Sequence, residues 1–558
     1  MTAPGLKRAG IGAVVLTCLA LAACGTSVRH RGAPAAASPA PVAGAAVAVG
    51  QRDFVSGDMG ALGLRTLESN AIPWKVATSA LFLQANGGRA RPITADDTAA
   101  VYRRFGFLTP ARIENWRGPP QPEGIAPLGI VRGMVDIGWP DIKLEVANFS
   151  CAACHAGPTY DARGQARQTA WLGASNTSLD FDRLTRELHG ALAHAMTDKR
   201  AFLRDIRTIY PGIDPRELRS IEDFVQPGLE ARLDRIAAWP TDDALFYPAG
   251  GPGLTNAVGA LKARLGLLDR RRAADERAFT QPPDLSNAVL RSALVSDGSH
   301  SAPGRRMPRE MTRHEVTAEQ LDGLAGVVST FLMGTMGLEP GAAARARPRV
   351  RGIVDALAAL EPQPFPGPID RPRALWGAEV YAAACARCHG TYSPGIDGVR
   401  LIRFPNRVVP LDEIGTDPTR ARALGADLLR AMRESASGRL VRLRTTSGYA
   451  APRLDGLWAS APYLHNGSVP TLWHLMHPAR RPARFEVGGH ALDFTRVGIA
   501  GVAGSDGVYR YRDDYRPWSM PALYNATTPG RSNRGHARPF EALSEPARDA
   551  LLEYLKLL

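Results

Sequence analysis

The sequence predicts a mainly α-helical protein with two domains, long loops and little β structure. The chain has 558 residues, which is more than one typical domain and points to two core-forming units. Apolar residues recur at helical spacing in several stretches, and long loops rich in proline and glycine, such as Tyr247–Gly253, separate them. The hydrophobic fraction of 45% is ordinary for a globular protein.

The first residues indicate export. A short positive segment with Lys7 and Arg8 precedes an apolar run from Ile11 to Ala23, which has the length of a signal sequence and is too short for a typical membrane-spanning helix. The run ends in Leu-Ala-Ala-Cys-Gly, which resembles the lipobox of bacterial lipoproteins. We therefore expect a signal peptide over 1–23 and lipidation of Cys24, with an ordinary signal peptide and a chance cysteine as the alternative. Because Gly25 rather than aspartate follows Cys24, the usual sorting of such lipoproteins implies the periplasmic face of the outer membrane or the cell surface.

Proline-rich segments divide the rest of the chain. Residues 24–51 are rich in alanine and proline and predict a flexible tether. The stretch EPQPFPGPIDRPR at 361–373 marks a boundary. We therefore expect a first domain over 52–360 and a second domain over 361–558.

Four stretches predict helices, because they carry apolar residues at helical spacing or helix-start signals. Thr94, Thr317 and Ser544 stand where N-cap residues are expected. The predicted helices cover 94–104, 179–196, 316–332 and 544–558.

The formal net charge of +14 has two interpretations. No long run of lysine or arginine occurs, which favours a solvated surface on an arginine-rich chain. The functional alternative is a positive face for an acidic redox protein or an anionic membrane surface. The sequence contains no nucleic-acid reader motif, so we do not expect nucleic-acid binding.

The six cysteines leave none for a structural disulfide. Cys18 lies in the predicted signal peptide and Cys24 is the predicted lipid anchor. The other four form two Cys-x-x-Cys-His motifs, which are Cys151-Ala-Ala-Cys154-His155 and Cys385-Ala-Arg-Cys388-His389. Two thiols at this spacing can reach the two vinyl groups of one haem, and the following histidine is placed to bind the iron. We therefore expect two covalently attached haem c groups rather than a zinc or dithiol redox site, since zinc would need further clustered ligands.

The second motif follows a helix pattern typical of cytochrome c. Gly377, Tyr381 and Cys385 are spaced i, i+4, i+8 and share one helix face. In the class I cytochrome c fold the C-terminal helix crosses the pre-haem helix at a small residue, so we expect the helix at 544–558 to cross at Gly377. The first motif follows no such helix pattern. The fold expected is therefore two cytochrome c-like haem domains.

Part of the chain resembles a known protein family. The segment Leu454–Leu472 contains APYLHNGS and resembles the corresponding segment of the di-haem cytochrome c peroxidase superfamily. Three flanking stretches resemble the branch that contains the rubber-cleaving di-haem oxygenases, and these are Phe149–His155, Pro366–Gly390 and Ser532–His536. The resemblance covers 120–558 in patches.

The resemblance implies that the two haems do different work. A haem with two protein ligands transfers electrons, whereas one with an open sixth position binds oxygen or peroxide. In the oxygenase branch the N-terminal haem is the reactive one, and the C-terminal haem has a second histidine from late in the chain. His536 matches that position, Met476 is the runner-up, and His465 is expected to be a pocket residue rather than a ligand.

The chain departs from the superfamily between the two motifs. Members commonly carry a Trp-Asp-Gly segment there, with the tryptophan between the haems, but this chain has Ser296-Asp-Gly instead. Ser296 therefore stands in the tryptophan position, and Trp239 is a substitute that the sequence cannot place. His300 is close to this segment and is a candidate for the distal side of the first haem, with a plain loop histidine as the alternative.

Three functions are consistent with these features. The first is a peroxidase-like or oxygenase-like oxidoreductase, which acts on hydrogen peroxide or oxygen and exchanges electrons with a redox protein. The second is a pure periplasmic electron carrier with two six-coordinate haems and no substrate. The third is a structural lipoprotein in which the haem is vestigial, and the intact motifs and helix pair oppose it.

Overall fold

The computed structural model describes residues 43–558 except 68, 119, 238–246, 305–309 and 313–314. The predicted signal peptide, Cys24 and Trp239 lie outside the described residues. The fold is mixed α/β, with 40% helix and 16% strand in several small sheets. The expectation of a mainly α protein with little β structure was wrong.

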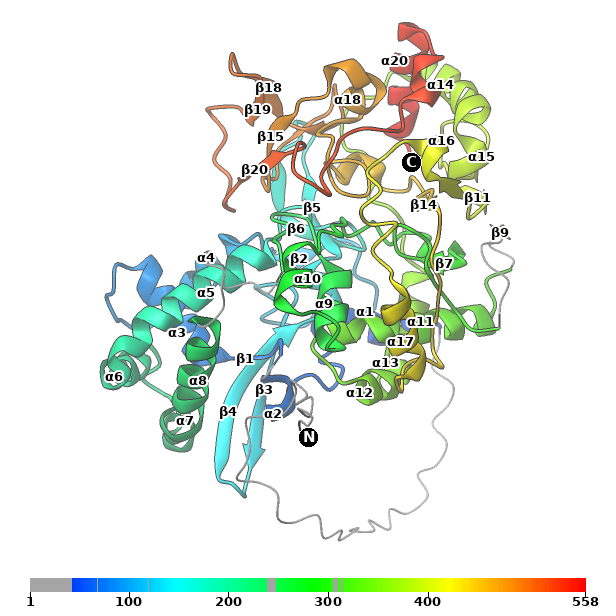
Figure 1. Ribbon diagram of the computed structural model, residues 1–558. Coiled ribbons are helices and arrows are strands. Elements are labelled where there is room, and N and C mark those ends of the chain that lie inside the picture. The colour runs from blue at the N-terminus through cyan, green and yellow to red at the C-terminus, as the bar shows by residue number, and fades with distance from the viewer. Residues whose placement is uncertain (1–42, 68, 119, 238–246, 305–309, 313–314) are drawn as a thin grey trace, which may run out of the picture.

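The clearest missed β structure is a long antiparallel hairpin of β3 (Ile130–Ile137) and β4 (Ile142–Phe149), in which Ile137 pairs with Ile142. Ile142, Leu144 and Val146 are buried at every second position of β4, which is the period of a half-buried strand. The hairpin extends away from the body in Figure 1. This alternation is visible in the sequence and was not used in the prediction.

Helices of the first half cover this hairpin and form one hydrophobic core with it, which includes Trp74, Leu81, Phe105 and Phe202. The short β1 (Ile72–Pro73) pairs with β4, and α7 lies against the same strand. The helices of this part are α3 (Trp74–Ala85), α4 (Ala95–Arg103), α5 (Phe181–Ala195), α6 (Lys199–Ile209), α7 (Pro215–Ser220) and α8 (Gln226–Ala237).

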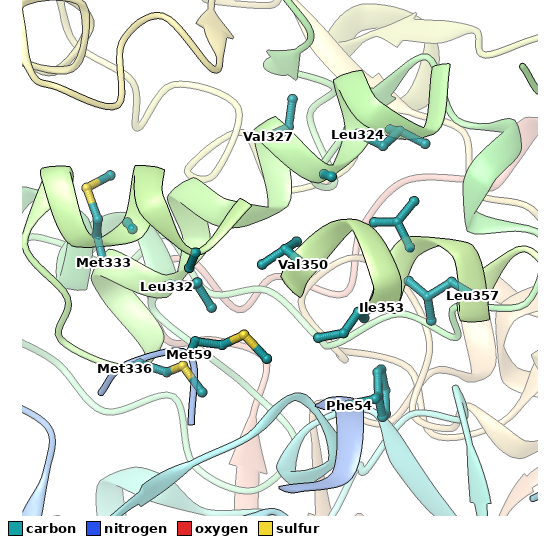
Figure 2. Close-up of a cluster of buried hydrophobic side chains, with 14 of the residues drawn as sticks. Phe54, Met59, Leu324, Val327, Leu332, Met333, Met336, Val350, Ile353 and Leu357 are labelled. Atoms are coloured by element: carbon teal, nitrogen blue, oxygen red, sulfur yellow. The ribbon is translucent and has the colours of Figure 1, made fainter. Parts of the chain in front are cut away.

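A second core joins segments that are far apart in the sequence. Figure 2 shows Phe54 and Met59 packed near side chains of two helices, among them Leu332 and Ile353. Leu428 and Met432, from the predicted second domain, belong to the same core. Its helices are α1 (Ala43–Ser56), α9 (Ala257–Arg264), α11 (Ala318–Thr335), α12 (Pro340–Arg345), α13 (Arg347–Leu357) and α17 (Ala426–Glu434). Three short helices lie elsewhere in the chain, and these are α2 (Leu64–Leu67), α10 (Arg270–Ala274) and α16 (Leu411–Ile414).

The C-terminal part contains the predicted pair of crossing helices, α14 (Arg371–Ala384) and α20 (Glu545–Leu555), which lie side by side in Figure 1. The crossing point is Gly377, where an added Cβ would lie 2.6 Å from the carbonyl carbon of Ala550. The predicted close approach is therefore confirmed. The other helices here are α15 (Ala386–His389), α18 (Leu472–Met476) and α19 (Arg538–Glu541).

The remaining strands form small sheets around these helices. They are β2 (Arg112–Ile113), β5 (Ala156–Tyr160), β6 (Ala166–Leu172), β7 (Ala293–Leu294), β8 (His300–Ser301), β9 (Met311–Thr312), β10 (Thr391–Tyr392), β11 (Leu401–Phe404), β12 (Val408–Pro410), β13 (Arg442–Leu443), β14 (Gly448–Ala450), β15 (Arg484–Val487), β16 (Leu492–Asp493), β17 (Gly498–Ile499), β18 (Gly501–Ala503), β19 (Val508–Tyr511) and β20 (Ala522–Asn525).

The four predicted helices exist, with boundaries within a few residues of those expected. Thr94 forms a capping box with Asp97 before α4, and the Thr317 side chain accepts a hydrogen bond from the Gln320 amide before α11. Ser544 precedes α20, but its side chain makes no capping hydrogen bond. Among the residues that the structure describes, no helix combines the length and the apolar character needed to cross a bilayer.

Candidate haem centres

Both Cys-x-x-Cys-His motifs line one cavity of about 2190 Å³. The six motif residues contribute to its wall, together with side chains of α5, α9, α11 and α18. The volume is about twice the upper end of the roughly 300–1,000 Å³ range of ordinary ligand pockets. The cavity therefore has room for a large cofactor at each motif.

The first motif follows no helix, as its sequence predicted, and the element before it is a strand, which was not predicted. β4 ends at Phe149, and Cys151–Ala153 form a single 3₁₀ turn. The Ser150 hydroxyl donates to the Val55 carbonyl at 2.6 Å, which ties the start of the motif to α1. This turn presents both thiols and His155 to the cavity.

His155 is held in one tautomer. Its Nδ1 lies 3.1 Å from the carbonyl oxygen of Pro283, and because a carbonyl only accepts, Nδ1 carries the proton and donates. The other ring nitrogen, Nε2, is then unprotonated and free to bind a metal. Burial lowers the pKa of His155 to about 4, which keeps the ring neutral.

The second motif repeats this arrangement on a helical frame. Cys385 is the C-cap of α14, and His389 ends α15. His389 Nδ1 donates to the Pro452 carbonyl at 2.8 Å, so its Nε2 is likewise free. The Tyr381 hydroxyl donates to the Gly390 carbonyl at 2.9 Å and fixes the chain directly after the motif.

All four motif cysteines are free thiols. By surface area they are partly exposed, yet burial raises the pKa of Cys151 to about 11 and that of Cys385 to about 12. All four cysteines line the cavity. Their partial exposure and the raised pKa values are therefore consistent, because the exposed part of each thiol faces the cavity. Among the described residues, no group of three or more His, Cys, Asp and Glu side chains forms a metal cluster.

The structure brings His536 next to His389, with the ring centroids 5.9 Å apart and the planes 51° apart. Both rings line the cavity, and they are close enough for one metal ion to be approached by both imidazoles. His536 has a positive φ of 50°, a conformation in which histidine is uncommon and which marks a constrained position. Met476 also lines the cavity and is buried, but the histidine pair favours His536 over Met476.

The loop that carries His536 is fixed by one arginine. Arg481 donates from Nη1 to the carbonyls of Asn533, at 2.6 Å, and Gly535, at 2.8 Å. From Nη2 it donates to the Leu475 carbonyl at 2.8 Å, which ties the loop to α18. The His536 amide donates to the Ile414 carbonyl at 2.7 Å. These bonds hold the unusual backbone of His536 in place.

His300 is a buried residue of β8 and not a loop histidine. It lines the cavity and packs edge-on against Phe331, with the centroids 5.5 Å apart. Its Nδ1 lies 2.8 Å from the Ser299 hydroxyl, which also lies 2.7 Å from the Asp297 carboxylate. Asp297 in turn forms a buried ion pair with Arg420 at 2.7 Å. This network fixes the ring of His300.

Two other residues predicted from the sequence, Ser296 and His465, also lie at the cavity. Ser296 lines the cavity, and its buried hydroxyl has no hydrogen-bond partner among the described residues. His465 also lines the cavity and stacks on Tyr449, with the centroids 4.1 Å apart. Burial lowers the pKa of His465 to about 3. His465 thus has the surroundings of a pocket residue.

Two buried arginines at the cavity were missed by sequence reasoning. Arg291 donates to the carbonyls of Ala293 and Val295, and Arg453 donates to those of Asp284 and Ser286. The charge of Arg453 acts on the Asp284 carboxylate and that of Asp297 acts on Arg291, and Arg453 Nε has no hydrogen-bond partner among the described residues. Burial lowers the pKa of Arg291 to about 10, and the charge of Arg453 adds to this shift. No local signal distinguishes these two side chains from the other basic residues of the chain.

The residues at this cavity fit a haem. Haem carries two carboxylates, and the guanidinium groups of Arg291 and Arg453 at the cavity wall can form charge-assisted hydrogen bonds with them. The paired thiols fit its vinyl groups, and the histidines with free Nε2 atoms fit its iron. The apolar wall fits the macrocycle.

Comparison with known proteins supports this assignment. Residues 448–486, which include His465, match the family described as RoxA-like, cytochrome c-like. Two uncharacterised proteins of Sinorhizobium fredii, y4iM and y4iJ, are 31% and 29% identical to parts of the chain, over 33% and 34% of its length. The chain covers 46% and 40% of those two relatives, less than half of each. A RoxA-like cytochrome c segment implies covalently bound haem c and indicates a c-type cytochrome with oxidoreductase-like function.

Proposed function

We propose that the protein is an exported di-haem c-type cytochrome that works as a peroxidase-like or oxygenase-like oxidoreductase. In this proposal the haem at His155 is the reactive one, and the haem at His389 and His536 transfers electrons. The redox partner is a separate electron-carrying protein, and the oxidant is hydrogen peroxide or oxygen.

The observation that carries the proposal is the difference between the two histidine environments. His389 has His536 beside it, with the centroids 5.9 Å apart. In the described part of the chain, His155 makes no ring contact with another histidine, and its motif forms a 3₁₀ turn that follows a strand. Such asymmetry suits one haem with two protein ligands and one with an accessible sixth position.

The chain's own residues would hold the cofactors in a defined way. Cys151, Cys154, Cys385 and Cys388 would form the thioether bonds, and His155 and His389 would bind iron through Nε2. When bound, haem supplies one-electron chemistry and a site for oxygen or peroxide. The Pro283 and Pro452 carbonyls would keep both imidazoles in the tautomer that binds metal.

His300 is the residue that we assign to proton handling. Burial lowers its pKa to about 4, so the ring is neutral and can accept a proton on Nε2. Ser299 and the Asp297–Arg420 pair orient the ring through Nδ1. The neutral imidazole at the cavity wall would accept a hydrogen bond through Nε2 from a protonated substrate oxygen.

Spectroscopy of the oxidised holoprotein tests the proposal. A pyridine haemochrome assay should give two haems per chain, and EPR should show one low-spin and one ligand-accepting haem. His536→Ala should convert the low-spin signal, while His465→Ala serves as the matched control at another cavity histidine. Two low-spin haems that ignore cyanide and carbon monoxide in both redox states would instead establish the pure electron carrier.

Turnover assays separate the two enzyme types. Peroxide consumption with a reduced donor protein would establish the peroxidase-like activity. Oxygen-dependent cleavage products from polyisoprene would establish the oxygenase-like activity. His300→Gln should slow either reaction with the haem content unchanged.

We also propose a lipid anchor at Cys24, with the protein on the periplasmic face of the outer membrane or on the cell surface. Mass spectrometry of the mature N-terminus would detect the lipid. Cys24→Ser should release the protein into the soluble periplasmic fraction.

A further inference from the structure

Two short segments meet between the haem motifs. Residues 283–287 contain the carbonyl that accepts from His155, and residues 452–456 contain the carbonyl that accepts from His389. The segments are more than 160 residues apart in the sequence. Each segment therefore contacts one of the two motif histidines, and the two segments come together only in the folded chain.

One side chain ties these segments together. Arg453 directly follows Pro452, and its Nη2 donates to the Asp284 carbonyl at 2.8 Å. Its Nη1 donates to the Ser286 carbonyl. One guanidinium therefore fixes the backbone on both sides of Leu285, next to the Pro283 carbonyl.

Two further contacts show that the segments are closely packed. Asn287 Nδ2 donates to the Asp455 carboxylate at 3.0 Å. Gly456 has a φ of +67°, and a Cβ added there would lie 2.8 Å from the Asp284 carboxyl carbon. At this point the Asp284 side chain packs directly against the backbone of Gly456. A shift of one segment would therefore move the other.

Burial makes the Arg453 connection rigid. The side chain is only 9% exposed, and both bonds that it makes are to backbone carbonyls. A charged donor gives stronger hydrogen bonds than a neutral one, and the planar guanidinium fixes their direction. Lysine has a single ammonium group and cannot make the same pair of directed hydrogen bonds.

We propose that Arg453 is a positioning residue that couples the two haem sites. It would hold the Pro283 carbonyl at His155 and the Pro452 carbonyl at His389 in one rigid unit. This inference depends on the proposed binding of iron by those two histidines.

The physical effect follows from the hydrogen bond at Nδ1. A well-placed carbonyl accepts a hydrogen bond from Nδ1. This bond makes the imidazole more basic, and a more basic imidazole stabilises oxidised iron bound to its Nε2. Without Arg453, segment 283–287 loosens and the bond to His155 weakens. The reduction potential of the first haem should then rise.

Arg291 provides a matched control. It is 8% exposed, lines the same cavity and also donates to two carbonyls, but these belong to Ala293 and Val295. Loss of a buried positive charge alone lowers the potential of a nearby haem, because it removes a group that opposes the oxidised state. A weaker hydrogen bond at His155 therefore raises the reduction potential of the first haem, whereas loss of the positive charge lowers it.

The experiment is a spectroelectrochemical titration of the purified holoprotein and of Arg453→Gln, Arg453→Lys and Arg291→Gln. We expect the first haem of Arg453→Gln to have a higher potential than that of Arg291→Gln by about 59 mV, which is a tenfold change in a one-electron equilibrium. The iron–histidine band of the reduced first haem, read by resonance Raman, should fall in frequency only in the Arg453 variants. Arg453→Lys should not restore either value.

Two results would overturn the inference. Equal potentials in Arg453→Gln and Arg291→Gln would show that only charge matters, and an unchanged iron–histidine band would show that Arg453 does not position the proximal carbonyl. The wild-type spectra test the underlying haem ligation separately, because without histidine-bound iron the band would be missing from the unmodified protein. Haem content and the unfolding midpoint of each variant identify one that simply fails to fold.

Discussion

Replacing Gly377 with alanine should destabilise the second haem site by forcing α14 away from α20. A Cβ at this position would lie 2.6 Å from the Ala550 carbonyl carbon and 2.9 Å from the Tyr554 Cβ, whereas real Cβ atoms essentially never come closer than 3.0 Å. Both neighbours are parts of a helix, so no flexible side chain can move aside. The Ala550 carbonyl oxygen would lie closer still to this Cβ, so the two helices must separate.

The size of the effect follows from two opposing contributions. Overpacking a close-packed core costs about 1–3 kcal/mol. Replacing a glycine inside a helix with alanine raises the unfolding free energy by about 0.5–1 kcal/mol. We therefore expect Gly377→Ala to lose about 1–2 kcal/mol of unfolding free energy, with Leu551 and Leu555 of the crossing helix losing packing.

The assay is guanidinium unfolding of the holoprotein, followed by circular dichroism and by haem absorbance. Gly190→Ala is the matched control, because Gly190 lies in α5 with nothing within 4 Å of an added Cβ. It should stabilise the protein by about 0.5–1 kcal/mol. If Gly377→Ala were as stable as Gly190→Ala, the inferred helix crossing would be wrong.

Two further predictions concern the cavity. Arg481→Met removes the donors to the Asn533 and Gly535 carbonyls, so the loop of His536 should loosen and the low-spin EPR signal should shrink; an undiminished signal would contradict this role. Burial raises the pKa of the Asp182 carboxyl to about 6 from its ordinary 3.8, so the folded protein holds a proton there that the unfolded chain releases at lower pH. The stability that this proton provides is complete below pH 3.8 and is lost as the pH rises through about 6. Asp182→Asn should therefore raise the unfolding free energy at pH 8, by up to about 3 kcal/mol, and change it little at pH 4; an equal effect at both values would refute the assignment.

Features of the fold that depend on a few neighbouring residues could be predicted from the sequence. The N-caps at Thr94 and Thr317 and the crossing at Gly377 depend on a few neighbouring residues, and the structure confirms all three. The β3–β4 hairpin was missed because its alternation of buried and exposed residues was not weighed against the helical periodicity found elsewhere. The sequence contained that information.

The cavity was predictable only in part. The motif histidines follow from their spacing, and the resemblance pointed to His536. The arginines at 291 and 453 could not be found, because their importance comes from backbone carbonyls brought close by the fold. His300 was a candidate from the sequence, but its orientation could not be predicted, because it depends on Ser299 and on the Asp297–Arg420 ion pair.

The shared cavity also has a consequence for how the protein is made. The four motif thiols line a cavity of about 2190 Å³ in the folded chain, where neighbouring segments leave them only partly exposed. An apolar space of this size without its cofactors would also lack the contacts that stabilise a core. Covalent attachment is therefore expected to come first and folding second, so that each haem serves as a nucleus around which distant segments of the chain assemble.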